Sequence, residues 1–208
     1  MKPKAILVAG PQASGKTSAI KLLSQLYEVK AWEEPATLVF KRYKIRGAIE
    51  SKSLQEKIWE TDIHQLENLD KKKINLLDNN FVNFAFYLYH HGITLESLRK
   101  IEIYLERLKK IDLAILFLDT SPKTSCERKR EIYMKRKYNK RQMENAKKII
   151  YGVYPFINSL AYGVAKSLRV PLYRIENETS LEEFKQEVRK GFEWLVSSKG
   201  WEVKKKVV

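Results

Sequence analysis

An eight-residue loop near the N-terminus constrains this chain more than any other feature. Residues 10–17, GPQASGKT, match the pattern G-x-x-x-x-G-K-[ST] of a phosphate-binding loop. The apolar residues 5–9 before it predict a buried strand, and residues 17–26 after it predict a helix. Glycine at both ends lets the backbone curl, so that successive N–H groups point at phosphate oxygens. A chance glycine turn is the alternative, and the flanking strand and helix argue against it.

The residues of this loop have separate expected roles. Lys16 is expected to reach the β- and γ-phosphates of a nucleoside triphosphate, and the Thr17 hydroxyl is expected to ligate Mg²⁺. The residues expected to wrap the phosphates are Gly10, Gln12, Ala13, Ser14, Gly15, Lys16 and Thr17. The loop therefore predicts a nucleoside triphosphate bound together with Mg²⁺.

Four further apolar segments read as strands, at residues 29–32, 74–77, 113–118 and 170–175. Helical segments separate them, including one capped by Thr94 and a last one opened by the capping box at residues 180–183. This alternation predicts an α/β fold of the P-loop NTPase type, a three-layer sandwich with a five-stranded parallel sheet and helices on both faces. At 208 residues, a single domain over 1–208 is expected.

The charge of the chain is strongly positive, with 40 Lys and Arg against 25 Asp and Glu, a net +15. Residues 123–148 alone hold eleven basic and three acidic residues. Such a segment is a solvated face, a nucleic-acid patch or a lid that clamps phosphates. The absence of an apolar run near 20 residues argues against a membrane protein. The single cysteine, Cys126, fits a reducing compartment, so we expect a cytoplasmic protein.

In a sheet of this kind the ligand site lies at the carboxyl ends of the strands. Acidic residues follow three of the predicted strands: Glu33 and Glu34, then Asp78, then Asp119. A carboxylate beside bound phosphates can hold Mg²⁺ or accept a proton from an attacking hydroxyl. Asp78 is the predicted metal ligand together with Thr17. Asp119 has helix capping as its alternative, because Thr, Ser and Pro follow it.

In this order the motifs resemble the thymidylate kinase family and its deoxynucleoside kinase relatives. The resemblance rests on the phosphate loop, residues 33–35 (EEP), Asp78 and residues 118–122 (LDTSP). It implies transfer of the γ-phosphoryl group of ATP to a nucleoside monophosphate, with a deoxynucleoside acceptor as the alternative, and it suggests a homodimer. It also implies that residues 123–148 form a lid in which Arg128, Arg130 and Arg136 are candidates for neutralising the transferring phosphoryl group. The predicted catalytic set is Lys16, Glu34, Arg128 and Arg136.

The acceptor side departs from the family. The family holds the acceptor's phosphate with two arginines, and Asn79 and Ile63 stand at the corresponding positions here. Arg42 and Arg46 are expected to replace them, because a guanidinium can serve from another element. Otherwise the acceptor lacks that phosphate. The predicted substrate-binding residues are Glu33, Arg42, Arg46, Asn79 and Phe81, with Phe81 either stacking on a base or packing in the core.

Three functions compete at this point. The first is an ATP-dependent phosphotransferase with a small nucleotide or nucleoside as partner. The second is a nucleic-acid-binding protein or a polynucleotide-end kinase, which the net charge motivates. The third is a nucleotide-dependent switch, and the guanine-reading Asn-Lys-x-Asp signature is absent because residues 139–142 read NKRQ.

Overall fold

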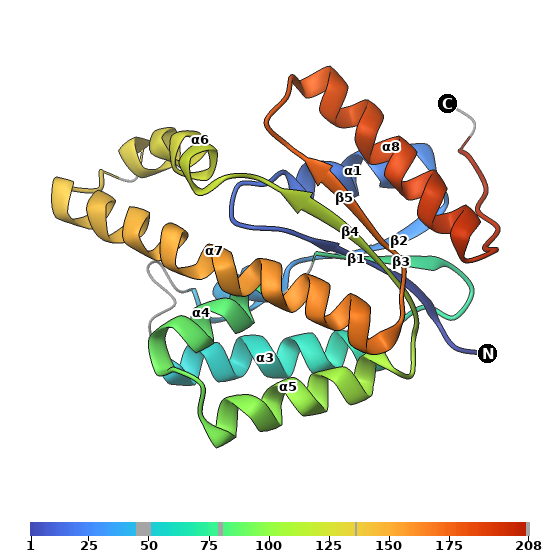
Figure 1. The fold of residues 1–208 in the computed structure, drawn as a ribbon, viewed down its shortest axis with the longest axis horizontal. Helices are drawn as coiled ribbons and strands as arrows, with labels where there is room; N and C mark the ends of the chain where they lie inside the picture. The colour runs from blue at the N-terminus through green and yellow to red at the C-terminus, as the bar shows by residue number, and fades with distance from the viewer. Residues whose placement is uncertain (45–50, 79–80, 136, 207–208) are drawn as a thin grey trace.

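A computed structural model describes residues 1–44, 51–78, 81–135 and 137–206. Its centre is a five-stranded sheet in the order β2-β3-β1-β4-β5, in which every neighbouring pair is parallel (Figure 1). The strands are β1 (Lys4–Ala9), β2 (Val29–Trp32), β3 (Ile74–Asp78), β4 (Asp112–Asp119) and β5 (Leu172–Glu176). The fifth strand begins directly after Pro171, which has no N–H to contribute to the sheet. All five expected strands are confirmed.

The central strands are apolar on both faces, because helices cover the sheet on both sides. On β1, Ala5, Leu7 and Ala9 belong to one hydrophobic cluster, while Ile6 and Val8 belong to the other. Residues 5–9 have no exposed surface. Side chains alternate between faces along a strand, so an unbroken apolar run is what a strand buried on both faces requires.

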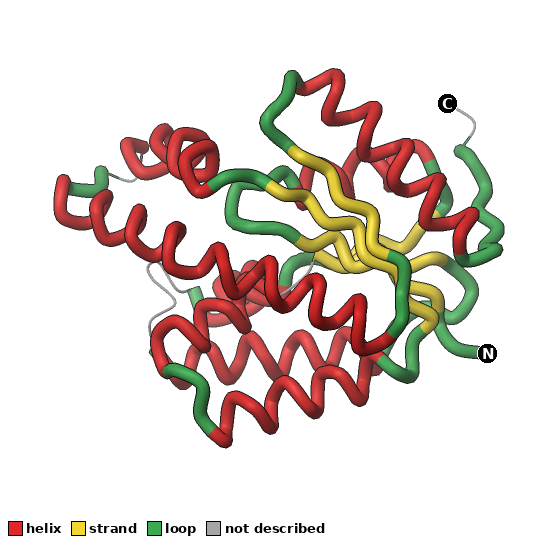
Figure 2. Tube along the Cα trace, viewed as in Figure 1, coloured by secondary structure: helices red, strands yellow, loops and turns green. Residues whose placement is uncertain are grey.

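Helices α1 (Lys16–Leu26) and α8 (Leu181–Ser198) pack on one face of the sheet. The other face is covered by α4 (Phe81–His91), α5 (Leu95–Leu108) and α7 (Lys140–Leu168). Helix α3 (Lys52–Glu67) packs beside α4 and α5 and adds Leu66 to the same cluster, and α2 (Pro35–Tyr43) pairs with α3. Figure 2 shows the sheet between these two layers of helices. The predicted three-layer P-loop fold is therefore confirmed.

Local signals in the sequence explain where several helices begin. Thr94 and Ser180 each accept a hydrogen bond from the backbone of the third helical residue, in the capping boxes of α5 and α8. Helix α6 (Pro122–Lys135) begins with a proline, whose missing N–H is not needed in the first turn. Asn139 forms a third capping box, which starts α7. Within the described residues, no helix is both long and apolar enough to span a bilayer.

Candidate active site

The phosphate loop links the end of β1 to α1 in a conformation that requires glycine at its first position. Gly10 has φ of 150°. A Cβ atom there would lie 2.3 Å from the Leu118 carbonyl oxygen and 2.6 Å from Ser14 Oγ. The loop therefore packs directly against the end of β4, and a larger residue would push it away.

Gly15 makes the transition from the loop to α1. Its φ is 90°, in the left-handed region, and it is the N-cap of the helix without a side-chain cap. A Cβ atom at this position would lie 2.9 Å from Phe184 Cζ on α8. No side chain of the described residues caps the first N–H groups of α1, and such groups form an anion site at the positive end of the helix dipole.

Lys16 is buried, with 9% of its surface exposed, and its side chain folds back onto the loop. Its Nζ donates hydrogen bonds to the carbonyl oxygens of Gly10 and Pro11, at 3.0 and 2.8 Å. Burial lowers the pKa of this amine, and the carboxylates of Asp78 and Glu34 oppose that shift. The cation thus lies within electrostatic range of two acids at the mouth of the loop.

Asp78 ends β3, directly beside β1, and pairs with Val8 in the sheet register. The Thr17 hydroxyl donates a hydrogen bond of 3.0 Å to Asp78 Oδ2, whereas Oδ1 is buried without a hydrogen-bond partner among the described residues. Burial raises the pKa of Asp78 to about 6; Glu34 also raises it, and Lys16 and Thr17 act in the opposite direction. A cation bound to this carboxylate would stabilise its ionised form.

The two adjacent glutamates after β2 take different positions. Glu34 is the N-cap of α2, accepts a hydrogen bond of 3.1 Å from the Thr37 hydroxyl, and raises the pKa of Asp78. Glu33 is exposed, and its carboxylate pairs with Lys41. The structure thus brings Lys16, Thr17, Glu34 and Asp78 together, and it leaves the Glu33 side chain on the surface.

Helix α6 lies against the phosphate loop, where a lid was expected. Arg128 donates hydrogen bonds to the carbonyl oxygens of Ala13 at 3.2 Å and Asn177 at 2.9 Å. The next residue, Lys129, donates to Gln12 Oε1 at 2.7 Å. Two cationic side chains of α6, Arg128 and Lys129, therefore contact the phosphate loop.

Asn177 is a site residue that the sequence analysis missed. It follows β5, its Nδ2 donates to the Ser14 carbonyl oxygen at 2.7 Å, and its backbone N–H donates to the Asp119 carbonyl oxygen at 2.7 Å. It is only 4% exposed. It thereby ties the phosphate loop, β4 and α6 together. The rule that pointed to the ends of the other strands would also have found it.

Asp119 has a different role from Asp78. Its side chain accepts hydrogen bonds from the Arg174 guanidinium at 2.7 and 3.0 Å and from the Tyr154 hydroxyl at 2.8 Å. These bonds join β4 to β5 and α7. Its carboxylate is thus engaged within the fold, and a catalytic role is not supported.

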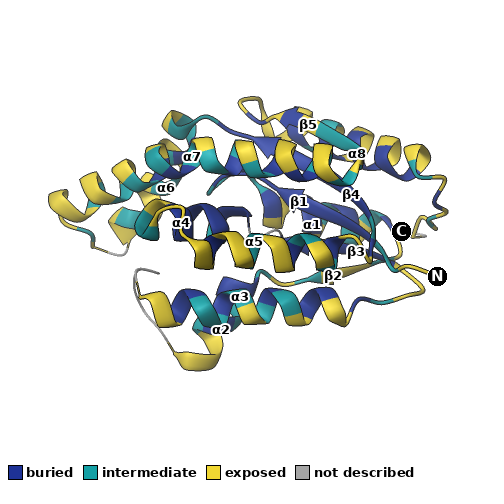
Figure 3. Ribbon diagram, turned by 60° about the horizontal axis from the view of Figure 1, so that its bottom comes forward, coloured by how far each residue is buried: buried dark blue, intermediate teal, exposed yellow. Residues whose placement is uncertain are grey.

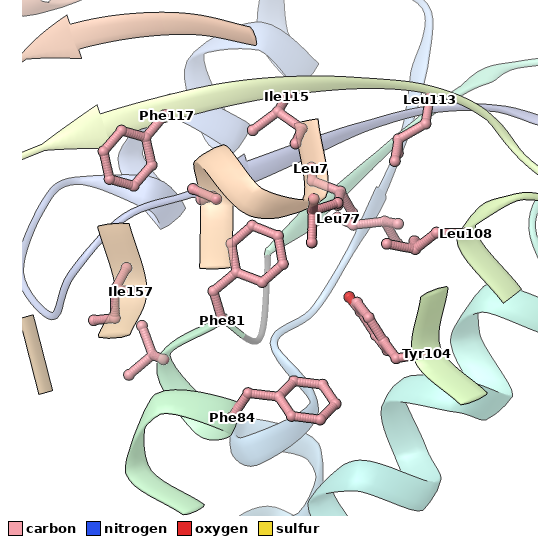
Figure 4. Close-up of a cluster of buried hydrophobic side chains, with 14 of the residues drawn as sticks. Leu7, Leu77, Phe81, Phe84, Tyr104, Leu108, Leu113, Ile115, Phe117 and Ile157 are labelled. Atoms are coloured by element: carbon pink, nitrogen blue, oxygen red, sulfur yellow. The ribbon is translucent and has the colours of Figure 1, made fainter. Parts of the chain in front are cut away.

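The stacking role expected of Phe81 is wrong. The ring is 1% exposed and lies in the core among Leu77, Ile157 and Phe84, as Figure 4 shows. Phe81 follows β3 too closely to leave the core, because α4 packs on the sheet immediately. Its alternative, a core position, is the correct interpretation.

The remaining predicted residues are only partly placed. Arg42 lies exposed near the end of α2, with its guanidinium carbon 5.9 Å from the Tyr43 ring centroid. Arg46, Asn79 and Arg136 fall outside the described residues. The predicted homodimer, single domain and cytoplasmic location stay predictions.

A pocket opens between α3, α4 and α5. Its walls combine aromatic and aliphatic side chains with a few polar ones: Gln55, Ile58, Trp59, Asp62, Asn83, Phe84, Tyr87 and Lys100. The Lys100 ammonium lies 4.4 Å from the Trp59 ring centroid and pairs with Glu56 at 2.5 Å. Trp59 Nε1 is buried and has no hydrogen-bond partner among the described residues. Apolar walls with a few polar groups are typical of a site for a small organic ligand.

Comparison with known protein families identifies the family of this chain. The sequence model of the AAA domain family matches residues 5–153, which is well over half of the 208 residues. The chain belongs to the AAA domain family. The match runs from β1 through the phosphate loop to the first part of α7, so it includes Lys16, Asp78 and Arg128 of this AAA domain. No curated protein matches the sequence.

Solved structures share the fold of this AAA domain at low sequence identity. A deoxyadenosine kinase from M. mycoides with bound dATP has a TM-score of 0.63 and 13% identity, over 91% of this chain and 99% of that chain. The same enzyme with the products dCMP and dCDP gives 0.61 and 13%, over 93% and 99%. The YorR protein from Bacillus subtilis, in complex with phosphorylated GDP, gives 0.52 and 16%, over 95% and 98%. These likenesses show a common fold.

Proposed function

We propose that this protein is an ATP-dependent phosphotransferase that acts on a nucleoside or a nucleoside monophosphate. The observation that carries the proposal is the group of Lys16, Thr17 and Asp78 at the mouth of the phosphate loop, where the Thr17–Asp78 hydrogen bond joins the first turn of α1 to the end of β3. Kinases with bound nucleotides among the structural neighbours support it.

On the donor side, the backbone N–H groups of the loop and of the first turn of α1 bind the phosphates. Lys16 exchanges the carbonyl oxygens of Gly10 and Pro11 for oxygens of the β- and γ-phosphates. Mg²⁺ fits this site, because Asp78 Oδ1 is a buried oxygen without a hydrogen-bond partner in the described chain and lies on the carboxylate that Thr17 contacts. When bound, Mg²⁺ would neutralise charge between the β- and γ-phosphates. Thr17 and Asp78 would hold it.

On the acceptor side, Glu34 is the candidate for taking the proton of the attacking hydroxyl. It lies within electrostatic range of Lys16 and Asp78, at the N-terminus of α2, while Glu33 points to the surface. A base must lie beside the transferring phosphoryl group, and of these two glutamates only Glu34 meets that condition. Arg128 would offset the negative charge that spreads over the phosphoryl oxygens.

The pocket between α3, α4 and α5 is the proposed acceptor site. Helix α4 begins just after β3, whose last residue is Asp78, so one end of this helix is near the reaction centre. The rings of Trp59, Phe84 and Tyr87 would enclose a base, and Gln55, Asp62 and Asn83 would bond to its polar edge.

A nucleoside acceptor is favoured over a monophosphate. Among the described residues that line the pocket the cation is Lys100, and Glu56 already neutralises it at 2.5 Å. Ile63, at the position of a family arginine, packs against the core. A monophosphate acceptor is the second candidate, and it would need Arg42 or Arg46 to bind its phosphate.

An acceptor panel tests the proposal. The protein is incubated with γ-labelled ATP, Mg²⁺ and each nucleoside or nucleoside monophosphate, and the labelled products are separated. We expect label on one or more nucleosides, unchanged by Arg42→Ala and Arg46→Ala together. Transfer to a monophosphate that the double variant abolishes would establish the second candidate. No transfer to either class would contradict the proposal.

A further inference from the structure

Helix α6 and the first part of α7 form a projection, here called the basic arm, over the described residues 123–135 and 137–148. Figure 1 shows both elements extending away from the sheet, and Figure 3 shows their outer ends largely exposed. Besides Arg128, eight basic residues in the described part of the basic arm are exposed: Lys123, Arg130, Lys135, Lys137, Lys140, Arg141, Lys147 and Lys148. The acidic residues of the same segment are Glu127, Glu131 and Glu144.

The eight exposed cations listed above differ from several other cations of the described chain, which are held in ion pairs with acids. Among the residues that the structure describes, none of these eight makes an ion pair with an acid. Elsewhere Lys100 pairs with Glu56 at 2.5 Å and Arg107 with Glu67 at 2.8 Å. A dense group of cations with few acids among them repels itself and attracts counterions, which a polyanion can displace. A solvated face of ordinary composition would carry more acids.

The inner end of the basic arm reaches the proposed donor site. Arg128 and Lys129 of α6 contact the phosphate loop at Ala13 and Gln12. Helix α6 runs for 14 residues, about 21 Å, and the first turns of α7 lie beside it, so the basic arm offers an extended charged surface rather than a single anion site. Near its tip the rings of Tyr133 and Tyr138 stack, with centroids 5.1 Å apart and planes at 10°. Aromatic rings among cations are typical of surfaces that bind single-stranded nucleic acid.

We infer that the basic arm binds the backbone of a single-stranded polynucleotide. An anionic membrane is the less suitable partner, because binding in a bilayer interface needs one apolar helix face. The exposed apolar residues of α6, Ile132 and Met134, stand two positions apart, which is about 200° around the helix. They form no common face. The inference does not depend on the phosphotransferase proposal, since it concerns binding alone.

The test uses the full chain and a fluorescein-labelled single-stranded DNA of about 20 nucleotides, longer than a typical single-strand site. Binding anisotropy is measured between about 50 and 200 mM salt. The variant K140Q/R141Q/K148Q removes three charges of the basic arm. The control K71Q/K72Q/K73Q removes three exposed charges just before β3. These lysines lie at the N-terminal ends of the strands, whereas the basic arm follows the C-terminal end of β4. ATP binding is measured on the same samples, so that a failure of the donor site is seen separately.

We expect wild-type binding to weaken steeply with salt. The variant of the basic arm should lose about 2 from the slope of log K against log salt, since each single-strand phosphate contact contributes about 0.7. The control should behave as the wild type. Equal loss in both variants, or no binding at the lowest salt, would overturn the inference. Tighter binding to phosphatidylserine vesicles than to the oligonucleotide would overturn it in favour of a lipid surface.

Discussion

The Thr17 hydroxyl and the Asp78 carboxylate are joined by a hydrogen bond of 3.0 Å, although 60 residues separate them in the chain. The bond exists because β1 and β3 are neighbours in the sheet and end at the same edge. It places the first turn of α1 beside a buried acid. In the proposed function these two side chains act as one metal-binding unit.

Asp78→Asn is expected to stabilise the protein at neutral pH while reducing transfer. The folded-state pKa of about 6 lies above the ordinary value of 3.8, so the ionised carboxylate is unfavourable in the fold. Proton binding by the Asp78 carboxylate therefore stabilises the folded state. This stabilisation is fully present below pH 3.8 and is lost as the pH rises through about 6. The variant should therefore gain about 1–3 kcal/mol at pH 7 and nothing near pH 4, measured by urea unfolding.

Asp70→Asn is the matched control for this prediction. The Lys72 backbone N–H lowers the pKa of Asp70, so its carboxylate favours the folded state. The control should thus lose stability at pH 7 rather than gain it. A destabilised Asp78→Asn variant at pH 7 would contradict the burial effect.

Gly15→Ala is expected to destabilise the protein by at least about 1 kcal/mol and to weaken ATP binding. Its φ of 90° is unfavourable for alanine, and the new methyl group would lie 2.9 Å from Phe184 Cζ. Gly163→Ala is the control, because this position in α7 has nothing within 4 Å of the new carbon. The control should gain about 0.5–1 kcal/mol in urea unfolding. Equal changes in the free energy of unfolding for Gly15→Ala and Gly163→Ala would argue against a strained loop.

Trp59→Phe tests the acceptor pocket. It keeps a ring and removes the buried Nε1–H, which has no hydrogen-bond partner among the described residues. If the acceptor accepts that bond, KM for the acceptor should rise about three- to tenfold with KM for ATP unchanged. Trp194→Phe, at an exposed ring of α8, should change neither value. A rise in KM for ATP alone would place the acceptor elsewhere.

Asn177→Asp tests the contact between the β5–α8 loop and the phosphate loop. The change replaces the Nδ2 donor, 2.7 Å from the Ser14 carbonyl oxygen, with an acceptor and adds a negative charge near the bound phosphates. We expect ATP affinity, measured by calorimetry, to fall about tenfold or more. Asn145→Asp makes the same exchange at an exposed position of α7 and should leave ATP affinity unchanged. Wild-type affinity in Asn177→Asp would reduce this residue to a packing role.

Much of this architecture could be predicted from local sequence. Strands buried on both faces are continuous apolar runs, which is why β1 and β4 were found within one residue of their bounds. The phosphate loop has its own motif. Asp78 followed from its place at a strand end, since parallel strands end at the same edge.

Other parts of the site depend on packing that the sequence does not encode locally. The acceptor pocket takes Gln55, Asn83 and Lys100 from three helices, and the angles between those helices decide that they meet. The role of Phe81 could not be predicted for the same reason. The local sequence around an aromatic residue that follows a strand is the same whether its ring stacks on a ligand or packs in the core. Asn177 has no motif, and only its position after β5 could have identified it.

The central claim is that the phosphate loop holds the donor of a phosphoryl transfer, and the effect of Lys16→Ala on that transfer tests it most directly. Lys21→Ala removes an exposed lysine from the same helix and is the control. With γ-labelled ATP and the best acceptor of the panel, Lys16→Ala should lower the transfer rate by at least about a hundredfold, because it removes a charge that meets the transferring group. Lys21→Ala should match the wild type, and urea unfolding should show both variants folded. Wild-type transfer by folded Lys16→Ala would contradict the account.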